Sequence, residues 1–219
     1  MTDPDTRPRA RLTRDKVLLA AIALADAAGI DSLTMRRLGV ELGVEAMSLY
    51  NHVANKSDLL DGMIDAVVGE IDLPPTGTPW RAAMLQRASS LRDVLSRHPW
   101  ATMLMDSRTS LGRATLQHHE YVVGTLRDAG FSIRLTAQAF SLMDSYIYGF
   151  ALQQNNLPPN SAETAQLAQH ITRQFAASDY PHLYEMAMEH VLQSNYNYAD
   201  EFAFGIDLIL EGLERSRQT

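Results

Sequence analysis

The chain has 219 residues, of which 46% are hydrophobic and 21% charged, and its formal net charge is −7 at pH 7. This length and composition suffice for one or two compact domains with a hydrophobic core. The absence of cysteine excludes disulfides, thiolate metal sites and cysteine nucleophiles. Charged residues interrupt every apolar stretch before the roughly 18 residues of a membrane span, and the first residues lack the pattern of a signal peptide. We therefore expect a cytoplasmic protein with no membrane partner.

Apolar residues recur at helical spacing along nearly the whole chain, and no alternating run of β-branched residues is bounded by hairpin signals. The predicted fold class is therefore all-α. Thr13 is expected to cap a first helix over residues 14–28 whose apolar stripe is Val17, Ala20, Ala21, Leu24 and Ala28. The next predicted helices run from Ser32 or Thr34 to Gly43, over residues 45–53, and from the cap residue Asn55 to about Ile71 with Asp58 at the third helical position.

A helix breaker follows this group. Residues 73–79 contain three prolines and one glycine, so no helix can continue through them. We place a domain boundary there, between residues 1–72 and residues 73–219. Beyond it the predicted helices cover residues 80–98, 102–107, 112–129, 134–154, 163–176, 180–194 and 199–217, with a mobile loop over residues 155–161.

Charge is distributed unevenly between these two parts. From Arg7 to Lys56 there are eight Lys or Arg against five Asp or Glu, whereas from Ser57 to Thr219 there are eleven against nineteen. A cationic arm that precedes or opens the first helix can reach DNA phosphates or a minor groove. The two parts are therefore expected to have different partners. The arm consists of Arg7, Arg9, Arg11, Arg14 and Lys16.

The second and third predicted helices form a helix-turn-helix around Gly43. The apolar residues Leu38, Leu42, Val44, Leu49 and Val53 are spaced to pack both helices against the first one. The third helix then faces outward with side chains that can bind base edges, thymine methyl groups or phosphates, and cations flank it. The alternative is a solvated helix face without a partner. The predicted DNA contacts are Arg36, Ala46, Met47, Ser48, Tyr50, Asn51, His52 and Lys56.

At these positions the stretch "LTMRRLGVELGVEAMSLYNHVANKSDLLDGM" resembles the DNA-binding domain of the TetR family of bacterial repressors. Trp80, "LSRH" at 95–98, "AGFS" at 129–132 and "FAFGIDLILEGLE" at 202–214 are similar to stretches of its tetracycline repressor subfamily. The resemblance implies an all-helical homodimer joined through a four-helix bundle of the last helix and the helix over 134–154. It also implies that a ligand in the larger domain changes the separation of the two reading heads. The same eight residues would contact DNA.

The ligand site departs from that subfamily. The resemblance aligns Leu104 and Gln153 with the histidine and glutamate that engage magnesium-tetracycline, and a neutral, apolar pair cannot replace hard-cation ligands. We therefore expect a mostly apolar effector with one or two hydrogen-bonding handles. Ordinary core packing is the alternative for each residue, including an Arg87 paired on its own helix and an Asp144 at an interface. The predicted pocket consists of Arg87, Leu91, Trp100, Met103, Leu104, His119, Val122, Phe140, Met143, Asp144, Ile147 and Gln153.

Signatures of catalysis, metal binding or cofactor binding are missing from the sequence. His118 and His119 are adjacent and point in different directions on a helix, and Asp179 near His182 is interpreted as a helix cap. The sequence therefore predicts no enzyme and no cofactor. It predicts a ligand-responsive repressor that binds a palindromic DNA operator as a homodimer and is released when an effector shifts its half-site spacing away from about 34 to 36 Å. The competing hypothesis is a helical small-molecule binding protein, which would not need the basic arm.

Overall fold

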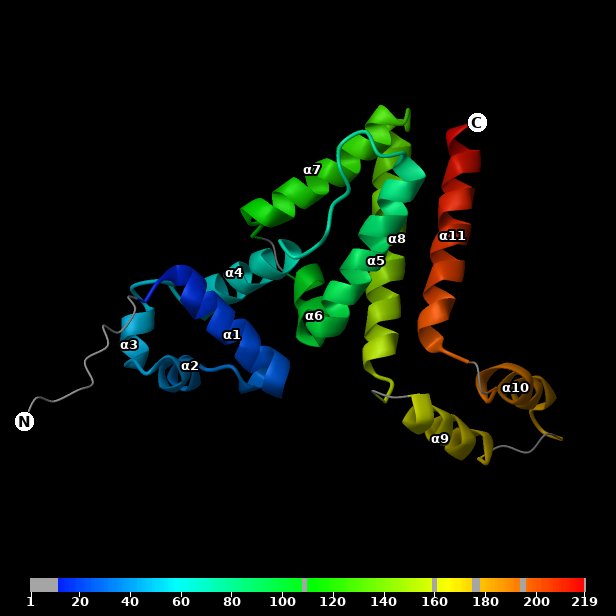
Figure 1. Ribbon diagram of the computed structural model, residues 1–219, viewed down its shortest axis with the longest axis horizontal. Coiled ribbons are helices and arrows are strands. Elements are labelled where there is room, and N and C mark those ends of the chain that lie inside the picture. The colour runs from blue at the N-terminus through cyan, green and yellow to red at the C-terminus, as the bar shows by residue number, and fades with distance from the viewer. Residues whose placement is uncertain (1–11, 108–109, 159–160, 175–177, 194–195, 219) are drawn as a thin grey trace, which may run out of the picture. The chain divides into compact units, whose positions relative to one another are not determined.

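The computed structural model describes residues 12–107, 110–158, 161–174, 178–193 and 196–218. This part of the chain is helical and contains no strand, which confirms the predicted fold class (Figure 1). It divides into two compact units. The first, which we call the head, holds the chain to Ile71 together with residues 100–119, and the second, the body, holds residues 72–99 and 120–219. This division differs from the two continuous ranges of the sequence analysis, because residues 100–119 lie in the head.

The helices of the head begin at the predicted capping residues. The side chains of Thr13, Thr34 and Asn55 accept hydrogen bonds from the backbone N–H groups of Lys16, Arg37 and Asp58. The third helix has only four residues instead of the predicted nine, because turns replace it after Leu49. The helices of the head are α1 (Arg14–Ala28), the short 3₁₀ helix η1 (Ile30–Ser32), α2 (Met35–Leu42), α3 (Ala46–Leu49), α4 (Lys56–Val68), most of α6 (Pro99–Ser107) and the first part of α7 (Arg113–Asp128).

The apolar residues expected to join these helices lie inside the head. Leu38, Leu49 and Val53 are buried, and so are Val17, Ala21 and Leu24 of α1. Leu42, Val44 and Ala20 are half-buried, and Ala28 is exposed at the end of the predicted stripe. Burial of this set holds α2 against α1 and α3 against α2, because each buried aliphatic side chain contributes about 1.5–3 kcal/mol of transfer free energy.

Two glycines allow the close packing of α2 and α3. A Cβ atom on Gly39 would lie 2.9 Å from the carbonyl oxygen of Val44 and 3.2 Å from the backbone nitrogen of Ala46. Gly43 ends α2 in the left-handed conformation with φ of 65°, which other residues adopt only with strain. The turn between the two helices therefore requires glycine at both positions.

An ion pair ties the first helix to the start of the fourth. The Arg14 guanidinium donates to both carboxylate oxygens of Asp58, at 2.7 and 3.0 Å, and to the carbonyl oxygen of His52 at 2.9 Å. The backbone N–H of Ala54 donates to the same carboxylate at 2.7 Å. Chiefly through the Arg14 hydrogen bonds, these contacts lower the pKa of Asp58 below its ordinary value. Arg14 therefore belongs to the fold of the head, although the sequence analysis placed it in the arm, and Arg7, Arg9 and Arg11 lie outside the described residues.

Further contacts join α6 and α7 to the rest of the head. The indole Nε1 of Trp100 donates to Asp26 of α1 at 2.7 Å. The carboxylate of Asp65 in α4 accepts from the backbone N–H groups of Ala114 and Thr115, at 3.3 and 2.8 Å, and from the hydroxyl of Thr115 at 2.9 Å. A side chain of α4 thus satisfies donors at the N-terminus of α7, which that helix cannot satisfy internally.

In the body, α5 packs along α8, and α8 packs along α11 (Figure 1). No described helix is long and apolar enough to cross a membrane. The boundaries of α6 and α10 differ from the prediction, since α6 begins at Pro99 and α10 continues into a π-helical turn. Asp179 does not cap α10, because Tyr180 is the cap residue and makes no side-chain bond there. The remaining elements are α5 (Trp80–Arg97), α8 (Ile133–Asn155), α9 (Ser161–Thr172), α10 (Pro181–Met186), the π-helix η2 (Ala187–Val191) and α11 (Tyr198–Arg217).

A buried ion pair lies between α5 and α8. The Arg87 side chain is fully buried and donates to the carboxylate of Asp144 at 2.5 Å. Its guanidinium carbon lies 5.9 Å from the centre of the Phe140 ring. Arg87 thus pairs across two helices, whereas the alternative considered from the sequence was a partner on its own helix. Removing one member of such a pair strands a buried charge, which is far more costly than losing an exposed pair.

We predict that Asp144→Ala lowers the free energy of unfolding by about 3–5 kcal/mol, because it leaves the buried Arg87 cation without its carboxylate. Urea denaturation followed by circular dichroism measures the change. The matched control is Asp207→Ala, which removes the exposed partner of Arg81 and should cost at most about 1 kcal/mol. Equal losses in the free energy of unfolding for the two variants would show that the Arg87–Asp144 pair contributes no more to stability than the exposed Arg81–Asp207 pair.

We predict that Asp58→Asn destabilises the protein at neutral pH and that the difference from the wild type disappears in acid. The pKa of Asp58 is lowered in the folded state, so its contribution is present above the ordinary carboxyl pKa and is lost as the pH falls through the folded value. Thermal unfolding of both proteins from about pH 7 to about pH 3 tests this. Asp31→Asn, on an exposed carboxylate of the head, serves as the control. A difference that does not change with pH would contradict the assignment.

Candidate nucleic-acid interface and effector site

The candidate nucleic-acid interface is the stretch from Ala46 to Lys56, which we call the reading segment, together with Arg36 in the first turn of α2. Leu49 and Val53 anchor the segment in the head, with 0% and 1% of their surface exposed. Arg14 holds its end through the carbonyl group of His52. A helix of only four residues has little stability of its own. These tertiary contacts therefore keep the reading segment in place.

The structure leaves the predicted DNA-binding side chains accessible. Met47 is 76% exposed and Tyr50 43%. Arg36, Asn51 and Lys56 are exposed, and Ala46, Ser48 and His52 are half-buried. Methyl, amide, hydroxyl, imidazole and cationic groups thus lie along one short segment. These are the groups that contact thymine methyls, base edges and phosphates in protein–DNA complexes.

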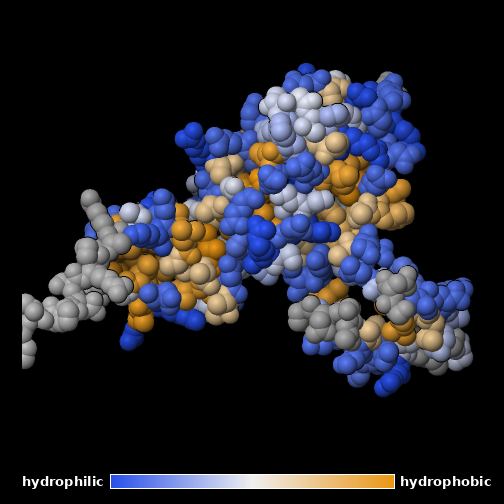
Figure 2. All heavy atoms as spheres, viewed as in Figure 1, coloured by the Kyte–Doolittle hydropathy of each residue, from blue (hydrophilic) through white to orange (hydrophobic). Residues whose placement is uncertain are grey.

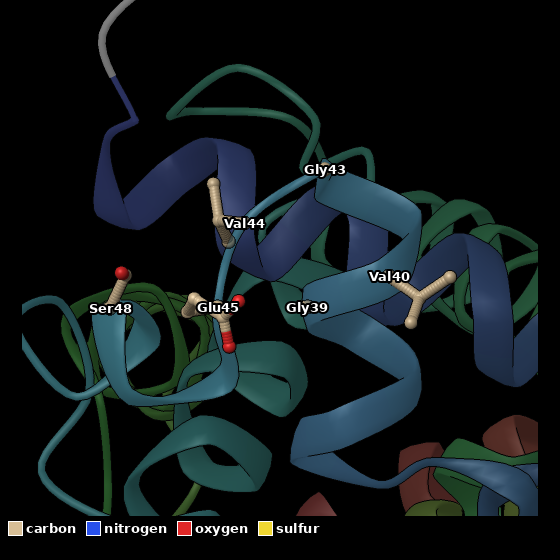
Figure 3. A pocket seen from close by; sticks show the side chains of 6 residues that line it. All are labelled: Gly39, Val40, Gly43, Val44, Glu45 and Ser48. Carbon is tan, nitrogen blue, oxygen red and sulfur yellow. The ribbon is translucent and has the colours of Figure 1, made fainter.

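A shallow, open hollow lies between α2 and the start of α3. Gly39, Val40, Gly43, Val44, Glu45 and Ser48 line it. In Figure 3 the side chains of Ser48 and Glu45 stand at one side of the hollow and Val40 at the other. Glu45 was not among the predicted contacts. The available signal was an acidic residue directly before the reading segment.

Eight of the predicted effector residues belong to the body. Leu91, Val122, Met143 and Ile147 are buried there, as are Arg87 and Asp144, and Phe140 is half-buried. Arg87, Phe140 and Asp144 are brought together by the ion pair and the ring contact. Gln153 lies apart from them, because it is exposed at the end of α8 and accepts a hydrogen bond from the Tyr198 hydroxyl at 2.7 Å.

The other four predicted effector residues belong to the head. Trp100 is buried and bonded to Asp26, Leu104 and His119 are half-buried, and Met103 is 66% exposed. The His119 ring lies 5.8 Å from that of His118. Trp100 therefore has a structural role in the head, joining α6 to α1. The sequence pattern predicts Trp100 as a wall of the effector pocket and gives no sign of this structural contact.

An aromatic cluster that the sequence analysis missed joins α8 to α11. Tyr146 stacks on Phe202 with centroids 5.5 Å apart, and Phe150 stacks on Tyr198 at 4.8 Å. The Tyr146 hydroxyl donates to backbone carbonyl groups of α11 and lies directly against Gly205. Burial raises the pKa of the Tyr146 and Tyr198 hydroxyl groups above their ordinary value. Within the described part of the chain, no three His, Asp or Glu side chains are grouped to hold a metal ion.

Comparison with known proteins assigns both parts of the chain to one family. Residues 17–63 match the model described as "Bacterial regulatory proteins, tetR family". Residues 73–217 match the model described as "Tetracyclin repressor-like, C-terminal domain". The first match contains the whole reading segment, and the second spans the range in which α5, α8 and α11 pack together. Regulators of this family are generally transcription factors and not enzymes.

Individual relatives agree with this assignment. An HTH-type transcriptional regulator of Saccharopolyspora erythraea is 35% identical over 83% of this chain and 77% of its own length. The HTH-type transcriptional repressor DrrR1 of Streptomyces coeruleorubidus is 33% identical over 96% of this chain and 80% of its own length. The structure of ActR from Streptomyces coelicolor in complex with actinorhodin superimposes with a TM-score of 0.79, at 28% identity, over 96% of this chain and 100% of that chain. The chain is therefore a ligand-responsive, DNA-binding transcription regulator that belongs to the tetR family of bacterial regulatory proteins.

Proposed function

We propose that this protein is a cytoplasmic repressor without enzymatic activity that binds a palindromic operator as a homodimer and is released by a mostly apolar small molecule. The observation that carries the proposal is the accessible reading segment, held on the head by Leu49, Val53 and Arg14. A purely structural helix pair would not need Met47, Tyr50 and Asn51 exposed beside two cations. Relatives support the direction of control, since DrrR1 is named a repressor.

Dimer formation is supported by apolar side chains on the surface of the body. Phe204 and Leu208 of α11 are 67% and 50% exposed, and Leu142 and Leu152 of α8 are 48% and 42% exposed. Figure 2 shows orange hydrophobic residues among hydrophilic ones at the surface of the molecule. Exposed apolar side chains in this number on two packed helices are typical of a protein interface. A second copy that covers them would supply the second reading segment for a two-fold symmetric operator.

The proposed effector site is centred on the buried residues of α5 and α8. Leu91, Met143 and Ile147 supply apolar walls, and Phe140 supplies an aromatic face. Arg87 and Asp144 supply the polar handles beside them. Pockets of this composition bind mostly apolar molecules that carry a few hydrogen-bonding groups. ActR, whose structure contains actinorhodin, gives a first compound to test.

A route for release starts at α7, which contributes residues to both units. Within the head, Asp65 of α4 holds the N-terminal donors of α7, and α4 begins directly after the reading segment. An effector that favours another position of α7 would thereby bias the position of α4. In this proposal the effector selects a state whose two reading segments no longer match the half-site spacing.

We predict that selection from a random duplex pool recovers a two-fold symmetric sequence. The wild type should bind it about 10³-fold or more tightly than random DNA at physiological salt. Lys56→Gln should weaken binding to both DNAs and lower the salt slope by about 0.9 per reading segment, whereas Asn51→Ala should lose about 1–3 kcal/mol of discrimination at one base pair. Weak binding that is blind to sequence and erased by salt would instead favour a small-molecule binding protein that does not regulate transcription.

We predict that actinorhodin releases the protein from the selected operator and that Phe140→Ala raises the concentration needed for half-release about tenfold, because an aromatic contact is lost. Fluorescence anisotropy of labelled operator measures release. Ile133→Ala, at an exposed position at the start of α8, is the matched control and should behave as the wild type. An equal response of both variants would show that Phe140 does not contact the effector. If actinorhodin did not release the wild type, it would be excluded as an effector.

A further inference from the structure

We propose that Glu45 is a specificity-determining residue of the DNA interface, whose carboxylate accepts a hydrogen bond from the N4 amino group of a cytosine in the major groove. The inference rests on the proposed DNA-binding function and deepens it. It adds an anionic reader to a set of eight contacts that contains only cationic, polar and apolar side chains. Its support comes from the position of Glu45, from the absence of a capping bond or ion pair to any described residue, and from its charge.

Glu45 occupies the residue directly before α3. Its carbonyl oxygen accepts the first hydrogen bond of that helix, from the backbone N–H of Ser48 at 2.9 Å. Its side chain lines the same hollow as Ser48 (Figure 3). The two side chains therefore border one hollow, so a DNA groove that receives Ser48 lies within reach of the Glu45 carboxylate.

Among the described residues, the Glu45 carboxylate has no structural partner. Glu45 is exposed, it makes no capping bond to α3, and it forms no ion pair with a described residue. Three other helices of the head begin with Thr13, Thr34 and Asn55, whose side chains do cap. Glu is not a favoured N-cap residue. Asp58 and Asp65, in contrast, accept hydrogen bonds within the head, from the Arg14 guanidinium and from the backbone N–H of Thr115. Glu45 is thus available to a partner molecule.

The charge of Glu45 selects the kind of partner group. Phosphates repel a carboxylate, so an acidic residue on a DNA-binding surface weakens sequence-independent binding. The major-groove edge of guanine offers only acceptors, whereas cytosine offers an N4 amino donor to which Glu side chains bind. Glu45 would therefore penalise random DNA and favour the sequence that places a cytosine opposite it. Both effects raise the ratio of specific to random binding.

The test compares Glu45→Gln with Glu41→Gln, which removes the same charge from an exposed residue of α2 that does not line the hollow. Affinities are measured for the operator selected by the wild type, for every symmetric single-base-pair variant of it, and for random duplex. For the wild type we expect about tenfold or greater discrimination at one symmetric pair of cytosine positions. Glu45→Gln should reduce that discrimination to about twofold or less and should raise the affinity for random DNA. Glu41→Gln should keep the discrimination.

The outcomes separate this inference from the proposed function. If the wild type selects an operator and Glu45→Gln keeps its discrimination at every base pair, the role of Glu45 is overturned while the regulator stands. A uniform gain in affinity, equal to that of Glu41→Gln, overturns it in the same way, because only net charge would then matter. If the wild type selects no operator, the proposed function itself fails. Circular dichroism should show both variants folded, since neither carboxylate binds a structural partner among the described residues.

Discussion

The helix-turn-helix of this protein depends on the contact of two backbones at Gly39. No Cβ atom fits between α2 and the start of α3, where the carbonyl group of Val44 would lie 2.9 Å away. Gly43 then turns the chain with a positive φ. This close approach lets a third helix of only four residues use Leu49 as an anchor in the core. Burial of Leu49 therefore determines which side chains of the reading segment are exposed, because so short a helix is not stable by itself.

The ion pairs of the two units differ in burial and in what they hold in place. In the head, Arg14 and Asp58 form a partly exposed pair that also binds the backbone around His52 and Ala54, so it fixes the geometry of the reading segment. In the body, Arg87 and Asp144 form a buried pair. A buried pair is costly to break but adds little net stability compared with an apolar core. In the proposed function, both groups serve instead as handles for a polar part of the effector.

The proposed regulator combines these features in one chain. In the proposed function, the reading segment provides several weak contacts to DNA, and specificity arises from the few side chains that meet base edges. A carboxylate at this surface weakens sequence-independent binding and can accept a hydrogen bond from a cytosine amino group. The same head holds Asp65 against the N-terminus of α7, a helix that the body shares. In the proposed function, α7 is therefore the helix that belongs both to the unit that reads DNA and to the unit that binds the effector.

Local signals in the sequence determined the all-helical class, the start of most helices and the end of the fourth helix before the prolines of residues 73–79. They also determined which side chains near Tyr50 face outward. Caps, prolines and apolar spacing act within a few residues, so one sequence suffices to recognise them. Long-range contacts were not determined in this way. The pairing of Arg87 with Asp144, of Arg14 with Asp58 and of Trp100 with Asp26 joins residues 57, 44 and 74 positions apart. Only the tertiary structure decided these partners, and with them the inclusion of residues 100–119 in the head, because packing and not local spacing brings such residues together.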